Sequence, residues 1–144
     1  MKEICVKASE DSLPEVCAFV NEALGMVEFS AELQRQIRLV VEEVFVNIAE
    51  YAYEGDAESD LPLYGNVLIS CERSSDPPQL VIRFADAGVP FNPLEAKAVS
   101  DSGSQFMERE GGFGIHLVKN TMDLVEYEYQ DRKNILTLTK YFGL

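Results

Sequence analysis

Cysteines are few in this chain, and none is placed for a disulfide framework or a zinc site. Cys5, Cys17 and Cys71 are odd in number and widely spaced, with no CxxC pair and no cysteine and histidine cluster near them. Disulfide-dependent domains and structural zinc sites both need such groupings. We therefore expect a chain that folds without either, in a reducing cytoplasm.

Long hydrophobic runs are also absent. The longest apolar stretches, residues 39–41 and 44–46, are separated by Glu42 and Glu43, whereas a helix that spans a bilayer needs about 20 apolar residues. The first residues alternate between polar and apolar, and do not follow the basic and then apolar order of a secretory signal. The sequence therefore predicts a cytoplasmic protein without a membrane segment.

Basic residues are scarce. The chain has 12 Lys and Arg against 25 Asp and Glu, which gives a formal net charge of -13, and no basic cluster interrupts this excess. Such a chain would repel a phosphate backbone, so nucleic acid is not expected as a partner. A basic protein partner stays open, as does the simpler interpretation that the acidity keeps the domain soluble.

The length and hydrophobic content of the chain suffice for one domain, and its periodicity indicates helices and strands. The 144 residues are 47% hydrophobic, enough to bury a core without disulfides or metal. Periodicity and turn residues first predict a strand (2–8), a helix that starts within 9–12 and ends at 25, and a long helix (30–52). A hairpin follows, with strands at 67–71 and 80–84 and a turn at 74–78, and then a loop (86–112). The chain continues with a short helix after Gly114 and a second hairpin, with strands at 124–129 and 135–142 and a turn at 131–134. This order predicts an α+β fold, a two-layer sandwich with helices on one face of a mixed, largely antiparallel sheet.

Three polar features stand where a plain core would not place them, and the first is in the long helix. Glu43 and Asn47 are four residues apart, so they share one face, beside the apolar stripe. A carboxylate and a carboxamide in that position cost free energy unless a partner satisfies them. A solvated helix edge is the alternative interpretation.

The second feature is Asp86, which ends an apolar strand and is followed by Gly88. A carboxylate at a strand end can accept a hydrogen bond from an exocyclic amine, and a glycine lets another molecule approach the backbone. A simple Asp-x-Gly turn is the alternative.

The third feature is the glycine run before the short helix, made of Gly111, Gly112 and Gly114. Glycines at a helix N-terminus expose backbone N–H groups at the positive end of the helix dipole, where phosphates bind. The run matches neither the P-loop pattern nor the dinucleotide fingerprint.

Together, and in this order, the three features resemble the N, G1 and G2 boxes of the GHKL, or Bergerat-fold, ATPases and kinases. The short length, the D-A-G-V-P-F-N-P run and the closing T-L-T-K-Y-F are most similar to the bacterial anti-sigma factor serine kinases. The resemblance covers nearly the whole chain. It implies a single histidine kinase-like ATP-binding domain over residues 1–144, with a lid at about 92–110.

The resemblance also implies ATP and Mg²⁺ as cofactors and a role for each residue. Asn47 would coordinate Mg²⁺ beside the nucleotide, and Glu43 would act as the general base. Asp86 would accept a hydrogen bond from the adenine amino group, and Gly88 would permit the approach of the nucleotide. The residues expected around the phosphates are Gly111, Gly112, Gly114 and Arg109.

Two features of the family pattern stay open in this sequence: the adenine-contacting threonine and the lid cation. Many relatives carry a threonine at the start of the last strand that reaches adenine through water. Asn134 stands in that stretch here, so it either substitutes or the contact is lost. The lid offers only Lys97 and Arg109 as cations, and Arg109 is nearer the glycines. His116 is expected on the surface of the short helix.

The function implied is transcription regulation, in which a kinase of this kind holds a sigma factor and phosphorylates a small anti-anti-sigma (STAS-type) protein on serine. A homodimer is possible by the same resemblance. The alternative is a module that binds ATP and sequesters a partner without phosphotransfer. Glu43 favours the kinase, because a pure binder needs no base there. An interaction scaffold with degenerate motifs is a further alternative.

Overall fold

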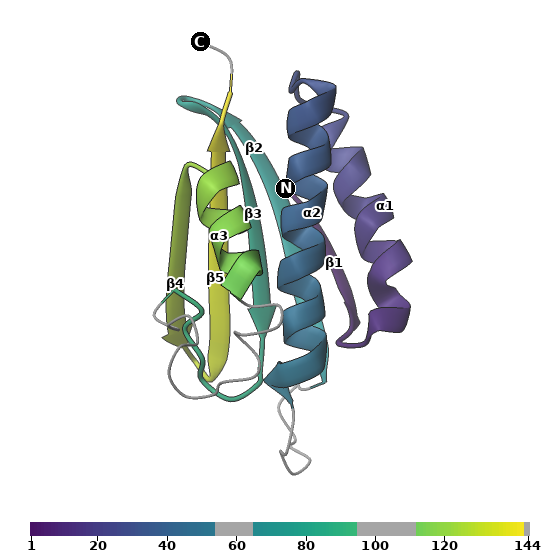
Figure 1. Ribbon diagram of the computed structural model, residues 1–144, viewed down its shortest axis with the longest axis vertical. Coiled ribbons are helices and arrows are strands. Elements are labelled where there is room, and N and C mark those ends of the chain that lie inside the picture. Colours follow the sequence, from purple (N-terminus) through teal and green to yellow (C-terminus); the bar gives the residue numbers. More distant parts are fainter. Residues whose placement is uncertain (54–64, 95–111, 143–144) are drawn as a thin grey trace.

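A five-stranded sheet forms one layer of the structure (Figure 1). The computed structural model describes residues 1–53, 65–94 and 112–142. Its strands, in the spatial order β1-β2-β3-β5-β4, are β1 (Lys2–Lys7), β2 (Asn66–Ser75), β3 (Pro78–Asp86), β4 (Leu124–Gln130) and β5 (Lys133–Tyr141). Every pairing between these strands is antiparallel, so the described sheet is more uniform than the mixed sheet that the sequence suggests.

Helices form the second layer and cover one face of the sheet (Figure 1). The helical elements described are η1 (Glu10–Ser12), α1 (Leu13–Leu24), α2 (Ala31–Asn47), η2 (Ile48–Ala52) and α3 (Gly112–Thr121). Ser30 caps α2 by accepting a hydrogen bond from the Leu33 amide at 3.1 Å, and Gly25 is the C-cap of α1. These two boundaries and the two-layer α+β sandwich confirm the prediction. None of the described helices is long and apolar enough to cross a membrane.

The hydrophobic core lies between the two layers. The strand register places Ile69 opposite Phe84 and Phe84 opposite Leu136, and all three are buried. The apolar face of α2 packs onto them through Ile37, Val40, Val41, Val44 and Phe45. Because α2 is anchored along most of its length, the polar residues near its C-terminal end are held beside the sheet.

The β2–β3 turn is shorter than the sequence predicts. The ladder continues until Ser75 lies opposite Pro78, so the turn consists of Asp76 and Pro77 and not of residues 74–78. Pro78 is the first residue of β3, a strand position that tolerates a residue without an N–H group. The prediction failed because the two prolines were taken to end both strands.

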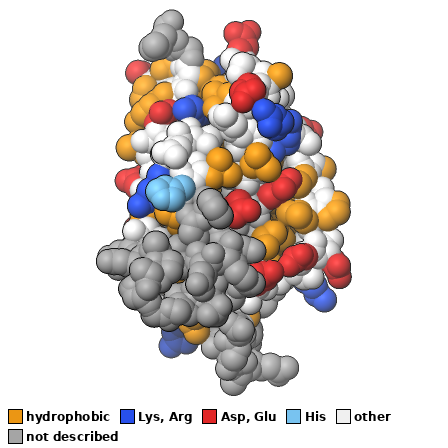
Figure 2. All heavy atoms as spheres, in the orientation of Figure 1, with side chains coloured by type: hydrophobic (Ala, Val, Ile, Leu, Met, Phe, Trp, Pro, Cys, Tyr) orange, Lys and Arg blue, Asp and Glu red, His pale blue; other side chains and the backbone are white. Residues whose placement is uncertain are grey.

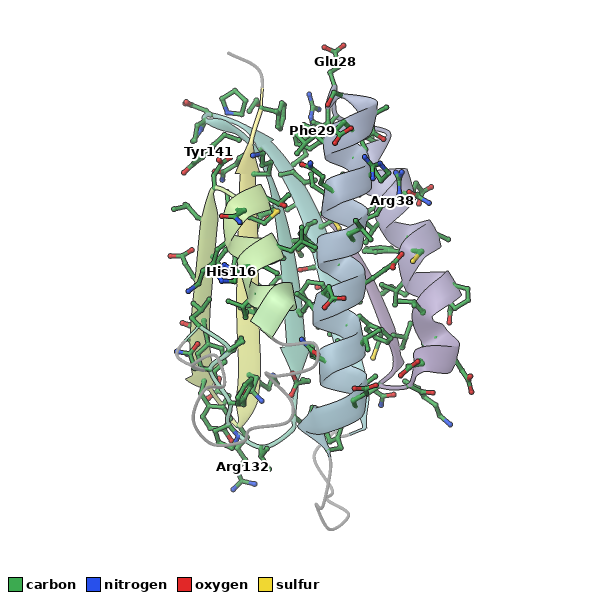
Figure 3. The ribbon with its side chains drawn as sticks, in the orientation of Figure 1. Glu28, Phe29, Arg38, His116, Arg132 and Tyr141 are labelled. Carbon is green, nitrogen blue, oxygen red and sulfur yellow. The ribbon has the colours of Figure 1, made fainter. Side chains whose placement is uncertain are left out.

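The β4–β5 turn is also shorter, with a consequence for the site. Asp131 and Arg132 form it alone, both with positive φ (54° and 62°), the conformation that a two-residue hairpin turn requires. Figure 3 shows Arg132 at the far tip of this hairpin. The predicted turn of residues 131–134 is therefore wrong at its C-terminal end, because Asn134 belongs to β5.

Two helix ends also differ from expectation. The long helix changes after Asn47 into the π-helix η2, a rare conformation that is frequent at functional sites. The third helix begins at Gly112, three residues before the expected start after Gly114. Most of the expected lid (92–110) lies outside the described residues, and with it Lys97, Arg109 and Gly111.

Candidate nucleotide-binding site

A cavity of about 190 Å³ lies between α2, α3 and the sheet. Its wall is mainly apolar, with side chains such as Ile48, Phe84 and Leu136, and Glu43, Asn47 and Asp86 add polar groups. A mostly apolar pocket with a few convergent polar groups is the usual form of a small-molecule site, although whole-ligand pockets typically measure about 300–1,000 Å³. The described residues therefore enclose a pocket of this kind that is smaller than that range, and two motifs far apart in sequence meet in it.

Asn47, the last residue of α2, brings a buried amide oxygen to this cavity. Within the described part of the chain, no donor reaches the Asn47 Oδ1 atom. Leaving a buried acceptor unsatisfied costs about 1–3 kcal/mol, so this atom calls for a donor or a cation. Glu43 lies one turn earlier and lines the same cavity, as the four-residue spacing predicts.

Glu42, next to Glu43 in sequence, has a different environment. Its Oε2 atom is 3.7 Å from the Cys17 Sγ atom of α1. The pKa of the Cys17 thiol is raised, mainly by burial and to a lesser degree by the nearby Glu42 carboxylate. Of the two consecutive glutamates, Glu43 alone is among the residues that line the cavity.

Asp86 ends β3 and is only 4% exposed. Its Oδ1 atom accepts hydrogen bonds from the Gly88 amide at 2.9 Å and from the Asn134 Nδ2 atom at 3.0 Å. Burial raises the pKa of Asp86, and these two hydrogen bonds offset part of that rise. No hydrogen bond among the described residues uses Oδ2. Asp86 therefore has one oxygen held by the protein, and its side chain is among those that line the cavity.

Asn134 is a site residue that the sequence analysis raised only as a replacement for a threonine. It lies directly opposite Asp86 in the β3–β5 register and is 7% exposed. Besides Asp86, its Nδ2 atom donates to the Val89 carbonyl at 2.9 Å, and its Oδ1 atom accepts from the Phe91 amide at 3.0 Å and from the Tyr127 hydroxyl. The signal that could have found it is strand alternation, because Asn134 precedes the buried Leu136 and Leu138 by steps of two.

Gly88 needs to be glycine for a reason internal to the protein. A β-carbon added there would lie 2.2 Å from the Ala52 carbonyl oxygen and 2.7 Å from the Ala52 carbonyl carbon. The next amide, that of Val89, donates to the same oxygen at 3.1 Å. This contact is a sufficient reason for a glycine at position 88. The resemblance had given a different reason, the close approach of a nucleotide.

Tyr53 provides a second link in the same region. Its hydroxyl donates to the Asn66 carbonyl at 2.8 Å and accepts from the Ala87 amide at 2.9 Å. One side chain from the end of the helical segment thus joins the start of β2 to the residue after Asp86.

The glycines of the third motif lie partly inside α3. Gly112 and Gly114 belong to its first turn, where backbone N–H groups have no partner within the helix and face the positive end of its dipole. Gly111 and Arg109 are outside the described residues. His116 is exposed and points away from α2 (Figure 3), as expected of a helix-surface residue.

The electrostatic surroundings of the cavity are acidic. Figure 2 shows carboxylate side chains over α1 and α2, in keeping with the net charge of -13. The described residues that line the cavity include the carboxylates of Glu43 and Asp86 and no Lys or Arg. A polyphosphate in this place would need backbone amides or a bound cation to offset its charge.

The fold and the cavity agree with a comparison of sequences. The model of the histidine kinase-like ATPase domain family matches residues 6–140, and the chain belongs to this family. Membership implies that the domain binds ATP. Among curated proteins, no sequence matches the chain significantly.

Solved structures share the fold. A chain of the SiaB-SiaC complex from Pseudomonas aeruginosa aligns with a TM-score of 0.57 at 13% identity, over 99% of this chain and 90% of that one. The histidine kinase AdeS from Acinetobacter baumannii aligns with a TM-score of 0.52 at 14% identity, over 100% of this chain and 69% of that one. At such identities the likeness concerns the fold alone; together with the family match, it confirms the GHKL architecture that the motifs predicted.

Proposed function

We propose that this domain is an ATP-dependent serine-protein kinase that acts as an anti-sigma regulatory factor and phosphorylates an anti-anti-sigma, STAS-type partner. The observation that carries the proposal is the meeting of Glu43, Asn47 and Asp86 in one cavity. The family to which the chain belongs supports ATP as the ligand.

Asp86 is suited to select adenine. Its Oδ2 atom is an acceptor at a mostly apolar cavity wall, where the amino group of adenine can donate to it. Guanine carries a carbonyl oxygen at the corresponding position. This oxygen and the Asp86 carboxylate are both acceptors, so no hydrogen bond could form between them. Unpaired polar groups of this kind are a common basis of discrimination between ligands.

Asn47 fits the role of a magnesium ligand. Its buried Oδ1 atom is without a donor among the described residues, and Mg²⁺ prefers oxygen ligands, usually few from the protein and the rest from water and phosphate. When bound, Mg²⁺ would offset the phosphate charge in this acidic site. The phosphates would meet the backbone amides of α3 at Gly112 and Gly114, and we keep Gly111 and Arg109 as further contacts.

Glu43 is the candidate general base. It shares one helix face with Asn47 and lines the same cavity, so its carboxylate lies near the place where the phosphates would meet the magnesium ligand. From there it can accept the proton of an attacking serine hydroxyl. A module that only sequestered its partner would not need a carboxylate at this point.

The proposed partners follow from the family resemblance: a sigma factor, an anti-anti-sigma protein and, in a homodimer, a second copy of this chain. A chain with this fold occurs in the solved SiaB-SiaC complex, which supports a protein as the binding partner. We also propose that residues 1–144 act as one domain whose segment 92–110 closes over the nucleotide.

The test is phosphate transfer to the partner protein. The domain is incubated with Mg²⁺, ATP and an anti-anti-sigma protein encoded beside it, and the partner is analysed by mass spectrometry. The expected result is one phosphate on a serine. Binding of ATP and partner without transfer would favour the sequestering module, and absence of ATP binding would leave only the scaffold.

A further inference from the structure

We propose that Asn134 is a positioning residue that sets the adenine selectivity of this site without contacting the base. The inference rests on the proposed ATP-binding function and adds to it a residue outside the motifs. Asn134 lies on β5 opposite Asp86, at the end of the cavity where the base would bind.

The side chain of Asn134 has no hydrogen-bonding capacity left for a ligand. A carboxamide has two N–H hydrogens and two acceptor lone pairs. Its Nδ2 atom donates to Asp86 Oδ1 at 3.0 Å and to the Val89 carbonyl at 2.9 Å. Its Oδ1 atom accepts from the Phe91 amide and the Tyr127 hydroxyl. The Nδ2 atom also lies 3.4 Å from the Gly88 carbonyl oxygen. A direct or water-mediated contact with adenine would have to displace one of these five contacts.

The neighbours also fix which way the amide faces. The Phe91 amide can only donate and the Val89 carbonyl can only accept, so the oxygen and nitrogen of the Asn134 amide cannot be exchanged. The Nδ2 atom must then face Asp86. The carboxylate is thereby held through Oδ1, which leaves Oδ2 for the ligand.

The same side chain also holds the segment after Asp86 that forms an apolar part of the cavity wall. Val89 and Phe91 both line the cavity and are among the more exposed large apolar residues of the structure. Both are tied to Asn134 through their backbones, at 2.9 and 3.0 Å. One side chain therefore sets the distance between the polar acceptor for the base and the apolar wall that would lie against it.

The test compares two nucleotides that differ only at the group that Asp86 would recognise. ATP and purine riboside triphosphate, which lacks the 6-amino group, are titrated with Mg²⁺ into the wild type and into Asn134→Ala. The wild type should bind ATP at least about fivefold more tightly than the analogue, the lower limit for loss of one buried hydrogen bond. In Asn134→Ala this ratio should fall toward one, because Asp86 is no longer held in place.

Two further variants keep the result interpretable. Asn134→Val suits a strand and has no hydrogen-bonding group in its side chain, so it should fold and also lose most of the ratio. Thr139→Val changes a buried residue of the same strand outside the cavity, and should keep the wild-type ratio. Equal weakening of both nucleotides in Asn134→Ala and Asn134→Val, which would leave the ratio unchanged, would overturn this inference alone. A wild type that binds neither nucleotide would overturn the proposed function together with it.

Discussion

Gly88 and Ala52 are in backbone contact, with no room for a β-carbon between them. Ala52 ends η2, the continuation of the helix that carries Asn47, and Gly88 follows the strand end that carries Asp86. This contact, together with the two hydrogen bonds of the Tyr53 hydroxyl and the packing of α2 on the sheet, therefore helps to set the spacing between the proposed magnesium ligand and the proposed adenine acceptor.

Gly88→Ala should unfold more easily than the wild type. The added methyl group would lie 2.2 Å from a backbone oxygen, and overpacking of this kind costs about 1–3 kcal/mol. Gly25→Ala is the matched control, because its β-carbon would meet nothing nearer than 3.5 Å and its φ of -67° suits alanine. Urea unfolding should show Gly25→Ala as neutral or stabilised by about 0.4–1 kcal/mol. Equal stability of the two variants would contradict the contact.

Tyr53→Phe tests the second link between the helical segment and the sheet. Removal of the hydroxyl leaves the Ala87 amide without its acceptor and the Asn66 carbonyl without its donor, which should cost about 1–3 kcal/mol. Tyr141→Phe, at an exposed tyrosine, should change the free energy of unfolding by less than about 0.5 kcal/mol. If both variants unfold at the same urea concentration, the Tyr53 hydroxyl has no stabilising role.

Asp86→Asn should weaken ATP binding and yet stabilise the ligand-free domain at neutral pH. The pKa of Asp86 is raised above its ordinary value of 3.8, mainly by burial. A carboxyl with a raised pKa in the folded state contributes stability below its unfolded pKa, and this contribution is lost as the pH rises through the folded pKa. The gain in melting temperature from Asp86→Asn should therefore be larger at pH 8 than at pH 4.

The same variant should lose about 1–3 kcal/mol of ATP binding free energy at pH 8, because its one amide oxygen would stay with the Gly88 amide and the Asn134 Nδ2 atom and an N–H group would then face the adenine amino group. Calorimetric titration with ATP, beside thermal melting of the free protein, measures both effects. A variant that is destabilised without ligand at pH 8 would show that the buried charge is not a cost to the fold.

The parts of this structure that could be predicted from sequence are those set by local chemistry. Ser30 and Gly25 mark helix ends because capping depends on neighbours in the chain, and the spacing of Glu43 and Asn47 fixes their shared face. The position of Asn134 in the last strand could not be predicted, because it depends on a two-residue turn at Asp131 and Arg132. Such turns usually contain a glycine, and this one does not. The Gly88 contact was equally hidden, since it depends on a π-helix and on packing between distant segments.

The last prediction separates the kinase from the sequestering module, through residues that share one helix face. Asn47→Ala should lose both ATP affinity and phosphotransfer, because the phosphate charge is then left without the proposed cation ligand. Glu43→Gln should keep ATP binding while serine phosphorylation falls by about 10²–10⁴-fold, the range that general-base catalysis contributes. Its amide has nearly the size of the carboxylate but cannot take up the proton.

Glu42→Gln is the control for this pair, because Glu42 is adjacent in sequence yet contacts Cys17 on α1. It should leave the rate of phosphotransfer within about twofold of the wild type, a change of less than about 0.5 kcal/mol in the barrier. Nucleotide titration and a single-turnover transfer assay on all three variants give the comparison. If Glu43→Gln and Glu42→Gln transfer phosphate equally well, Glu43 is not the base. If the wild type itself binds nucleotide and partner but transfers nothing, the cavity serves only to hold ATP while the domain sequesters its partner.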